Sequence, residues 1–149
     1  MTTLGDITVL DRPAIGFLCS NKAQSGAILP CLDWAVKVSK GDTPIISTFH
    51  SELERAVLDV LLRGKCPIIL VLGRKLYKHM PEHLQHAYDS GRLIFVSLSD
   101  APRITRATAH LCNDYICLHS AYLTFGYVAP DSSLRELYDA HRHHATIIM

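Results

Sequence analysis

The 149-residue chain has almost no net charge and no long apolar run. Fifteen Lys and Arg against 14 Asp and Glu leave a formal charge of +1. No overall field therefore draws the protein to nucleic acid, and any anion site must come from a local cluster. No apolar stretch reaches the roughly 20 residues that a membrane helix needs, and no signal peptide opens the chain. These absences predict a soluble, cytoplasmic protein without membrane contacts.

The sequence also lacks cysteine pairs with the spacing of a metal or redox site. Five cysteines stand at positions 19, 31, 66, 112 and 117, and none forms a C-x-x-C pair. The count is odd, and several of these cysteines lie within apolar runs. This pattern favours buried free thiols in a reducing compartment over a disulfide framework.

Common catalytic and nucleotide-binding motifs are absent as well. The chain contains no Walker loop, no G-x-G-x-x-G, no G-x-S-x-G and no P-G-G-x-G-T. The histidines in His141–His144 are interpreted as cations closing the last turn of a helix, because no Cys or acid stands at ligand spacing. The order His79-x-x-Glu82-His83 matches an inverted metalloprotease motif, but Pro81 interrupts it at a predicted helix start. We therefore expect no metal, no cofactor and no catalytic residue.

What the sequence does contain is a regular alternation of short apolar runs and amphipathic segments. The runs are continuously apolar, as strands buried on both faces of a parallel sheet are. This order predicts one domain over residues 1–149, a Rossmann-like three-layer α/β/α sandwich with a mostly parallel, doubly wound sheet. The predicted strands are 14–19, 44–47, 67–72, 93–97, 122–128 and 145–148, and the predicted helices are 27–40, 51–63, 81–90, 105–119 and 132–142.

Basic residues gather in the loops that follow the predicted strands. Ligands of open α/β sheets bind outside the carboxyl ends of the strands, so these loops should form one rim. Arginine forks and free helix N–H groups suit phosphate, which makes a phosphate site the expected use of this rim. The loops carry Asp100 and Asp131 against six cations, namely Lys22, Arg74, Lys75, Lys78, Arg103 and Arg106.

The helix predicted after the second strand has a strong start signal. Ser51 and Glu54 have the spacing of a capping box, which uses the donors at the helix start. We therefore expect an anion to lie beside this helix end, held by Ser47, Thr48 and the arginines opposite. Phe49 and Tyr77 are the candidates for contact with a base, although a packed Phe49 is the simpler interpretation.

Four stretches, in this order, resemble one family. They are AIGFLCSNK, ISTFHSELERAVLDVLLRGKCPIILVLGRKLYK, GRLIFVSLSDAPRITRATAHLCNDYICLHS and GYVAPDSSL. They are similar to the DNA-processing protein A (DprA, or Smf) family, whose fold is related to that of the "lonely guy" cytokinin-activating enzymes. The resemblance covers residues 14 to 134. It implies a Rossmann-like domain that binds nucleotides or single-stranded DNA. It also implies that two copies of the domain can form a homodimer.

The resemblance places some family positions on this sequence and shows two departures. The Ser-Gly turn after the second strand corresponds to Ser47-Thr48, and the basic residue ahead of the fourth helix corresponds to Arg103. Where the family has Arg-Asn-Arg, this chain has Cys112-Asn113-Asp114, and where it has Gly-Gly, this chain has Asp131-Ser132. Losing two arginines predicts weak binding to single-stranded DNA.

The predicted function is therefore non-enzymatic binding of a nucleotide or single-stranded nucleic acid, with phosphate at the carboxyl ends of the strands. Two alternatives stay open: a nucleotide-cleaving enzyme related to the lonely-guy phosphoribohydrolases, and a vestigial domain that binds a protein partner. The candidate phosphate- or nucleotide-binding residues are Ser20, Asn21, Lys22, Ser47, Thr48, His50, Ser51, Arg74, Arg103, Arg106, Asn113 and Ser132.

Overall fold

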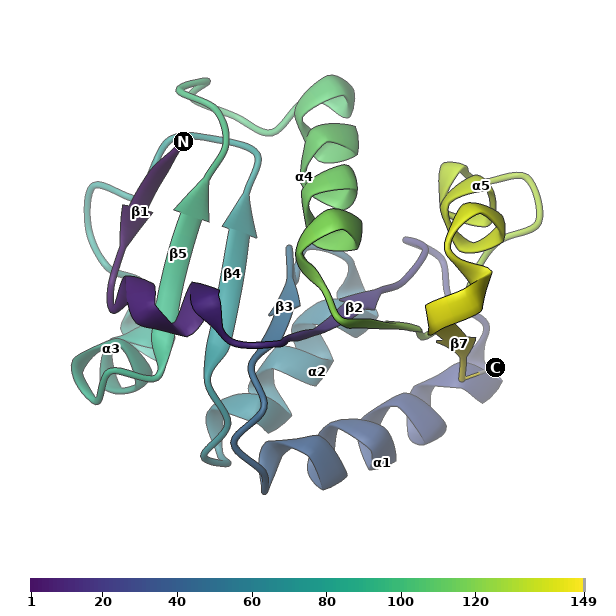
Figure 1. The fold of residues 1–149 in the computed structure, drawn as a ribbon, viewed down its shortest axis with the longest axis horizontal. Coiled ribbons are helices and arrows are strands. Elements are labelled where there is room, and N and C mark those ends of the chain that lie inside the picture. Colours follow the sequence, from purple (N-terminus) through teal and green to yellow (C-terminus); the bar gives the residue numbers. More distant parts are fainter. Residues whose placement is uncertain (149) are drawn as a thin grey trace.

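A computed structural model describes residues 1–148 as a seven-stranded sheet with five α-helices (Figure 1). The strands are β1 (Thr2–Leu4), β2 (Ile15–Leu18), β3 (Ile45–Ser47), β4 (Ile68–Leu72), β5 (Leu93–Ser97), β6 (Tyr122–Phe125) and β7 (Ala145–Ile147). The helices are α1 (Ile28–Ser39), α2 (Glu52–Leu62), α3 (Glu82–Asp89), α4 (Arg106–His119) and α5 (Ser133–Ala140). Short 3-10 turns occupy Ile7–Asp11, Ser25–Ala27 and Arg142–His144.

The sheet is doubly wound, as predicted. Its strand order is β1-β5-β4-β3-β2-β6-β7, and every neighbouring pair is parallel except β1 with β5. From β2 the chain advances through β3 and β4 to β5, and it then returns to the other side of β2 for β6 and β7. All six predicted strands and all five predicted helices exist, with ends that differ by up to three residues.

The sequence analysis missed the antiparallel edge strand β1. Thr2 pairs with Ser97, and Leu4 pairs with Phe95. Three residues are too few for a periodic pattern, and Leu4 is exposed rather than buried. The following turn, Ile7–Asp11, was also not predicted; Asp6 caps it by accepting a hydrogen bond from the Thr8 N–H.

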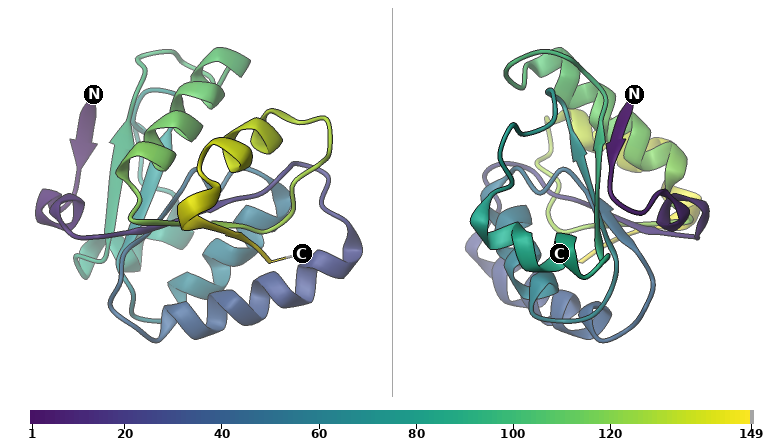
Figure 2. Two further views of the ribbon diagram at one scale, coloured as in Figure 1. Left: turned by 45° about the vertical axis from the view of Figure 1, so that its right-hand side comes forward. Right: turned by 90° about the vertical axis from the view of Figure 1, so that its left-hand side faces the viewer.

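Two helix layers enclose the sheet and form a separate apolar core on each face. Helices α1, α2 and α3 cover one face, where Phe17, Leu61 and Leu93 are buried. Helices α4 and α5 cover the other face, where Ile116 and Phe125 are buried. Figure 2 shows the sheet edge-on between these layers. Successive strand residues point to opposite faces and both faces are apolar, which explains why the strands read as continuous apolar runs.

The helices are short and several are locally capped. Ser51 and Glu54 form the predicted capping box at the start of α2, and Thr105 and Thr108 form another at the start of α4. Helix α3 ends before Gly91, whose φ of 78° is the left-handed conformation that favours glycine. Within residues 1–148, none of the helices has the length and apolarity needed to cross a bilayer.

All five cysteines are buried free thiols, which confirms that prediction. Cys19, Cys31 and Cys66 belong to the core on the α1–α3 side, and Cys112 and Cys117 to the core on the α4–α5 side. Burial raises the pKa of Cys31 and Cys117 to about 11 each, so both remain protonated at neutral pH. These thiols act as small apolar side chains in the packing.

Helix α4 can lie close to β2 because residue 16 has no side chain. A methyl group on Gly16 would lie 2.5 Å from Ser120 Oγ, 2.8 Å from Leu123 Cδ2 and 2.9 Å from Ile116 Cγ2. The Ser120 hydroxyl cannot move away freely, because it donates a 2.6 Å hydrogen bond to the Ile116 carbonyl oxygen. The fit of α4 on the sheet therefore depends on glycine at this position.

We predict that Gly16→Ala lowers the free energy of unfolding by about 1–3 kcal/mol, the usual effect of overpacking a core. Gly41→Ala is the matched control, because a methyl group there would meet only the Val38 carbonyl oxygen at 3.7 Å. Urea unfolding followed by circular dichroism measures both variants. Equal midpoints for the two would contradict the tight fit of α4 against β2.

Candidate functional site

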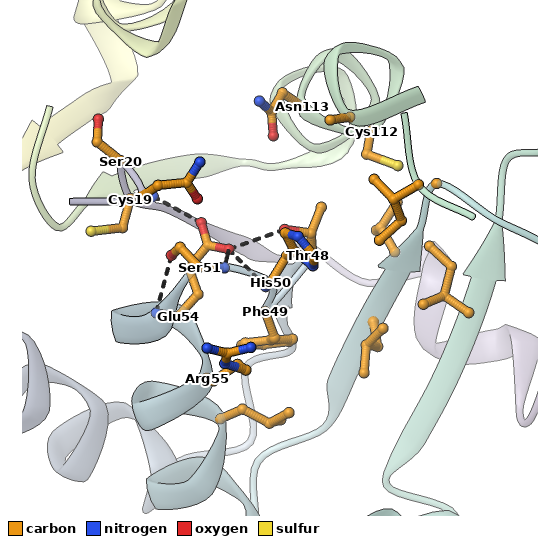
Figure 3. A pocket seen from close by; sticks show the side chains of 18 of the residues that line it. Cys19, Ser20, Thr48, Phe49, His50, Ser51, Glu54, Arg55, Cys112 and Asn113 are labelled. Atoms are coloured by element: carbon orange, nitrogen blue, oxygen red, sulfur yellow. Dashed lines mark hydrogen bonds between the residues drawn. The ribbon is translucent and has the colours of Figure 1, made fainter. Parts of the chain in front are cut away.

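A cavity of about 850 Å³ opens at the carboxyl ends of the strands. Its floor comes from the ends of β2, β3 and β4, and its walls come from α2 and α3 on one side and from α4 and the start of α5 on the other. This is the edge where open α/β sheets bind ligands, and the volume suits a molecule of nucleotide size. Figure 3 shows part of the lining, with Asn113 on α4 across the cavity from the loop at Glu54.

The buried carboxylate of Glu54 organises the loop between β3 and α2. Glu54 is only 5% exposed. Its Oε2 accepts a 2.9 Å hydrogen bond from the Cys19 N–H. Its Oε1 accepts bonds from Thr48 Oγ1 at 3.0 Å, from the His50 N–H at 2.9 Å and from the Ser51 N–H at 3.2 Å. Figure 3 shows these donors converging on the carboxylate.

The sequence analysis placed an anion beside this helix end, held by Ser47, Thr48 and the arginines opposite, but Glu54 itself takes the Thr48 hydroxyl. A carboxylate offers about four acceptor positions, and this one receives four donors, three on Oε1 and one on Oε2. Burial raises the pKa of Glu54, and the hydrogen bonds from His50, Ser51, Cys19 and Thr48 lower it by a smaller amount. The ring of donors is thus used within the protein and is closed to a ligand.

Phe49 gives this loop an uncommon backbone conformation. Its φ is 48°, the only positive φ outside glycine among the described residues. The left-handed conformation costs a bulky residue about 1–2 kcal/mol, and such strain is concentrated at functional sites. The Phe49 N–H donates a 3.1 Å bond to Ser47 Oγ, and the ring is buried against the core. The turn at Phe49 precedes the two backbone N–H groups that point at Glu54.

The charged groups of the cavity come from opposite walls. Arg55 lies on α2 and Arg106 lies in the first turn of α4, and both line the cavity and are exposed. The carboxylates in the lining, among residues 1–148, are the buried Glu54 and the exposed Asp59. Among the exposed groups of the lining, two arginines therefore outnumber one carboxylate, while Glu54 adds a buried acid within its own ring of donors.

The structure brings eight of the twelve candidate residues together. These eight line the cavity and are Ser20, Asn21, Thr48, His50, Ser51, Arg106, Asn113 and Ser132. Four others do not line it: Lys22, Ser47, Arg74 and Arg103. The Ser47 hydroxyl is enclosed and accepts from the Phe49 N–H, so it supports the loop and does not face a ligand. Three of the eight residues that line the cavity already donate a hydrogen bond to Glu54, namely Thr48, His50 and Ser51.

The predicted basic rim is more dispersed than the sequence suggested. Arg74 donates to the Lys75 carbonyl oxygen at 3.0 Å, and its guanidinium lies 4.9 Å from the centre of the Tyr77 ring. Arg103 is exposed in the loop before α4. Of the six loop cations, Arg106 is the one that lines the cavity. A loop can follow a strand and still direct its side chains away from the strand ends.

Several lining residues were not among the candidates. Arg55 and Asp59 lie on α2, His83 lies on α3 and His110 lies on α4. Of these, His110 could have been predicted from helical spacing, because it lies on the same helix face as the candidates Arg106 and Asn113. No local pattern indicated that α2 and α3 would direct Arg55 and His83 into the same cavity.

The structure of α4 also changes how this chain compares with the Arg-Asn-Arg stretch of the DprA family. Cys112 is 1% exposed and belongs to the core on the α4–α5 side. Asn113 lines the cavity, and Asp114 is exposed outside the lining. Cys112 also borders the cavity, so an arginine at this position would begin in the core and would have to displace packed side chains to reach a phosphate. Asp131 is likewise exposed outside the lining, whereas Ser132 lines the cavity.

The loops after β2 and β6 are tied together beside the cavity. The Ser20 N–H donates to the Tyr127 carbonyl oxygen at 2.9 Å, and the Ala129 N–H donates to Ser20 Oγ at 2.9 Å. Ser20 Oγ also lies 3.5 Å from Ser132 Oγ. These bonds join the loops after β2 and β6, the neighbouring strands on either side of which the chain builds the sheet in opposite directions. They also fix the start of α5 at the cavity wall.

The histidines near the C-terminus contact one another. His144 Nδ1 lies 2.8 Å from His143 Nε2, and the neighbouring Arg142 forms a 2.6 Å ion pair with Asp139. No group of three or more His, Cys, Asp or Glu within residues 1–148 is arranged to hold a metal ion.

By sequence, the chain matches no protein-family model and no curated protein. By structure, it is similar to DNA processing protein A (DprA) from Streptococcus pneumoniae, with a TM-score of 0.75 and 14% identity. It is also similar to DNA processing protein A from Helicobacter pylori, with a TM-score of 0.76 and 14% identity. The chain has a DprA-like fold.

These matches cover nearly all of this chain but only part of each DprA chain. They cover 97% of this chain in both cases, but 52% of the Streptococcus pneumoniae chain and 69% of the Helicobacter pylori chain. The chain thus spans about half the length of the first of these DprA structures. The Helicobacter pylori protein is described as binding single-stranded DNA. The resemblance inferred from the four sequence stretches is confirmed as a likeness of fold.

Proposed function

We propose that this protein binds nucleotides or single-stranded nucleic acid through phosphate in the cavity at the carboxyl ends of β2, β3 and β4. The observation that carries the proposal is the pair Arg55 and Arg106, which face one nucleotide-sized cavity from opposite walls with Asp59 as the exposed acid. The DprA-like fold and the single-stranded DNA bound by the Helicobacter pylori protein support the same ligand class.

One phosphate is expected at Arg106 on the α4 side of the cavity and another at Arg55 on the opposite wall, both outside the ring of donors around Glu54. Arg106 lies in the first turn of α4, where the positive end of the helix dipole adds to its own charge. Asn113 and Ser132 add neutral hydrogen-bonding groups on the same side. Glu54 opposes a second anion at its own loop, because like charges repel and its donors are already used.

The lining favours binding over cleavage of a glycosidic bond. Glycoside hydrolysis generally needs two carboxyl groups, one acting on the leaving group and one on the sugar or water. Among the described residues, the cavity presents Glu54 and Asp59. Glu54 is buried and already receives four hydrogen bonds, so Asp59 is the exposed carboxylate of the lining.

Alanine variants of the two cavity arginines test the proposal. We predict that Arg55→Ala and Arg106→Ala each weaken binding of an oligothymidylate about tenfold, the effect of one lost charge-assisted contact. Each change should also reduce the slope of log affinity against log salt by about 1. Fluorescence anisotropy at two or more salt concentrations measures both effects.

Arg63→Ala is the matched control, since Arg63 is an exposed arginine at the opposite end of the helix that carries Arg55. Its affinity should equal that of the unmodified protein. An equal loss in all three variants would show that the DNA surface lies elsewhere. No binding by the unmodified protein at low salt would favour the alternative of a fold retained for a protein partner.

A further inference from the structure

Three histidines from three separate elements line the cavity. His50 lies in the loop between β3 and α2, His83 in the first turn of α3 and His110 in the second turn of α4. All three are exposed, so solvent protons reach their rings. The backbone N–H of His50 donates to Glu54, but its ring is not a hydrogen-bond partner of that carboxylate. All three histidines line the cavity in which the proposed function places phosphate, and His110 lies one helical turn after Arg106 on α4.

The other ionisable groups that face this space do not cancel a change in histidine charge. Arg55 on α2 and Arg106 on α4 remain cationic throughout the neutral range. Asp59 on α2 is the exposed carboxylate of the lining. Glu54 is enclosed and already receives four hydrogen bonds. The start of α5 contributes Ser132, Ser133 and Leu134, which carry no charge.

The two cysteines of the lining also stay uncharged. Burial raises the pKa of Cys19 to about 12 and that of Cys112 to about 11. Tyr77 also lines the cavity, and the Arg74 guanidinium lies 4.9 Å from the centre of its ring. Near neutral pH, histidine is the side-chain type whose charge responds to modest changes in proton concentration. The cationic charge of the cavity can therefore vary with the charge on His50, His83 and His110.

We propose that this cavity is a pH-regulated anion site, in which protonation of His50, His83 and His110 strengthens binding of the phosphate backbone of single-stranded nucleic acid. This inference rests on the proposed function. Each imidazolium adds a cation and a second N–H donor beside the phosphate, and a bound phosphate in turn stabilises the imidazolium. Binding is then coupled to proton uptake, so affinity rises as pH falls.

Oligothymidylate without terminal phosphate is the probe that isolates this coupling. Its phosphodiesters and thymine bases do not titrate near neutral pH, and a rhodamine label avoids the pH response of fluorescein. We predict that lowering the pH from about 7.5 to about 6 tightens binding by the unmodified protein about tenfold. The triple variant His50→Gln, His83→Gln, His110→Gln should lose most of this change. Circular dichroism at both pH values verifies that the variants remain folded.

The control is a second triple variant, His86→Gln, His119→Gln, His143→Gln, whose three exposed histidines lie outside the cavity. It should retain the full pH dependence of the unmodified protein. Equal affinity at both pH values in the unmodified protein would overturn the inference, as would a pH dependence that survives in the cavity variant. In those cases, weaker binding by Arg106→Ala would leave the proposed function intact. Absence of DNA binding at both pH values would overturn both.

Discussion

Replacement of Glu54 by alanine should destabilise the protein by about 3–5 kcal/mol, because it leaves four buried or partly buried donors without their acceptor. The Cys19 N–H, the His50 N–H, the Ser51 N–H and the Thr48 hydroxyl all lose their acceptor. These groups join the end of β2 to the loop after β3, so the loss should loosen the cavity wall as well as lower stability. Urea unfolding measures the change in free energy.

Small anions provide a sharper readout of the same variant. The alanine variant should contain a space ringed by the donors that previously held the carboxylate, so formate or acetate should raise its melting temperature more than that of the unmodified protein. Glu54→Gln should show little rescue, because its amide oxygen still accepts while its NH₂ group faces the Cys19 N–H.

Glu52→Ala is the control for both measurements, because Glu52 is an exposed acid in the first turn of the same helix. It should cost less than about 1 kcal/mol, the usual value of a surface charge near a helix start. Similar unfolding midpoints for Glu52→Ala and Glu54→Ala would refute the role given to the buried carboxylate.

Replacement of Arg92 by alanine should lower the free energy of unfolding by about 2–4 kcal/mol, since several charge-assisted bonds to carbonyl oxygens at and after the end of α2 are lost. The Arg92 guanidinium donates to the carbonyl oxygens of Leu61 at 2.8 Å, Leu62 at 3.3 Å and Cys66 at 3.1 Å. It therefore satisfies the final carbonyls of α2 and ties the helix to the start of β5.

Two further variants separate this role from a general loss of charge. Arg92→Lys should retain part of the stability, because an ammonium keeps the charge but cannot reach three carbonyls with a planar fork. Arg63→Ala removes an exposed arginine from the same helix end and should change stability by less than about 0.5 kcal/mol. Measured by chemical unfolding, Arg92→Ala should be the least stable of the three variants, Arg92→Lys intermediate and Arg63→Ala the most stable. An unfolding midpoint of Arg92→Ala equal to that of the unmodified protein would refute the prediction.

The sequence by itself determined the architecture of this protein. Continuous apolar runs such as 68–72 and 93–97 predicted buried parallel strands, and the alternation with helices predicted the doubly wound sandwich. The capping box of Ser51 and Glu54 was also predictable. These features depend on contacts between residues close in the chain, or on the simple requirement that both sheet faces be covered, so local patterns are sufficient to indicate them.

The tertiary structure alone decided what the capped helix end does. The Glu54 side chain that completes the local capping box also accepts from the Cys19 N–H, which lies 35 residues away directly after β2. No spacing rule contains that contact, because it depends on the adjacent positions of β2 and β3 in the sheet. The contact uses a backbone donor within the protein, at a strand end next to the place where the sequence predicted an anion.

Tertiary structure likewise decided which charges reach the cavity. The sequence analysis identified the cations of the loops, but Arg74 lies over the Tyr77 ring and Arg103 lies outside the lining of the cavity. Arg55 and His83 instead reach the cavity from helices. The direction of a loop side chain follows from its neighbours, and the face of a helix follows from how the helix rotates against the sheet. Sequence position therefore located the edge of the sheet that forms the site, and packing selected the residues that line it.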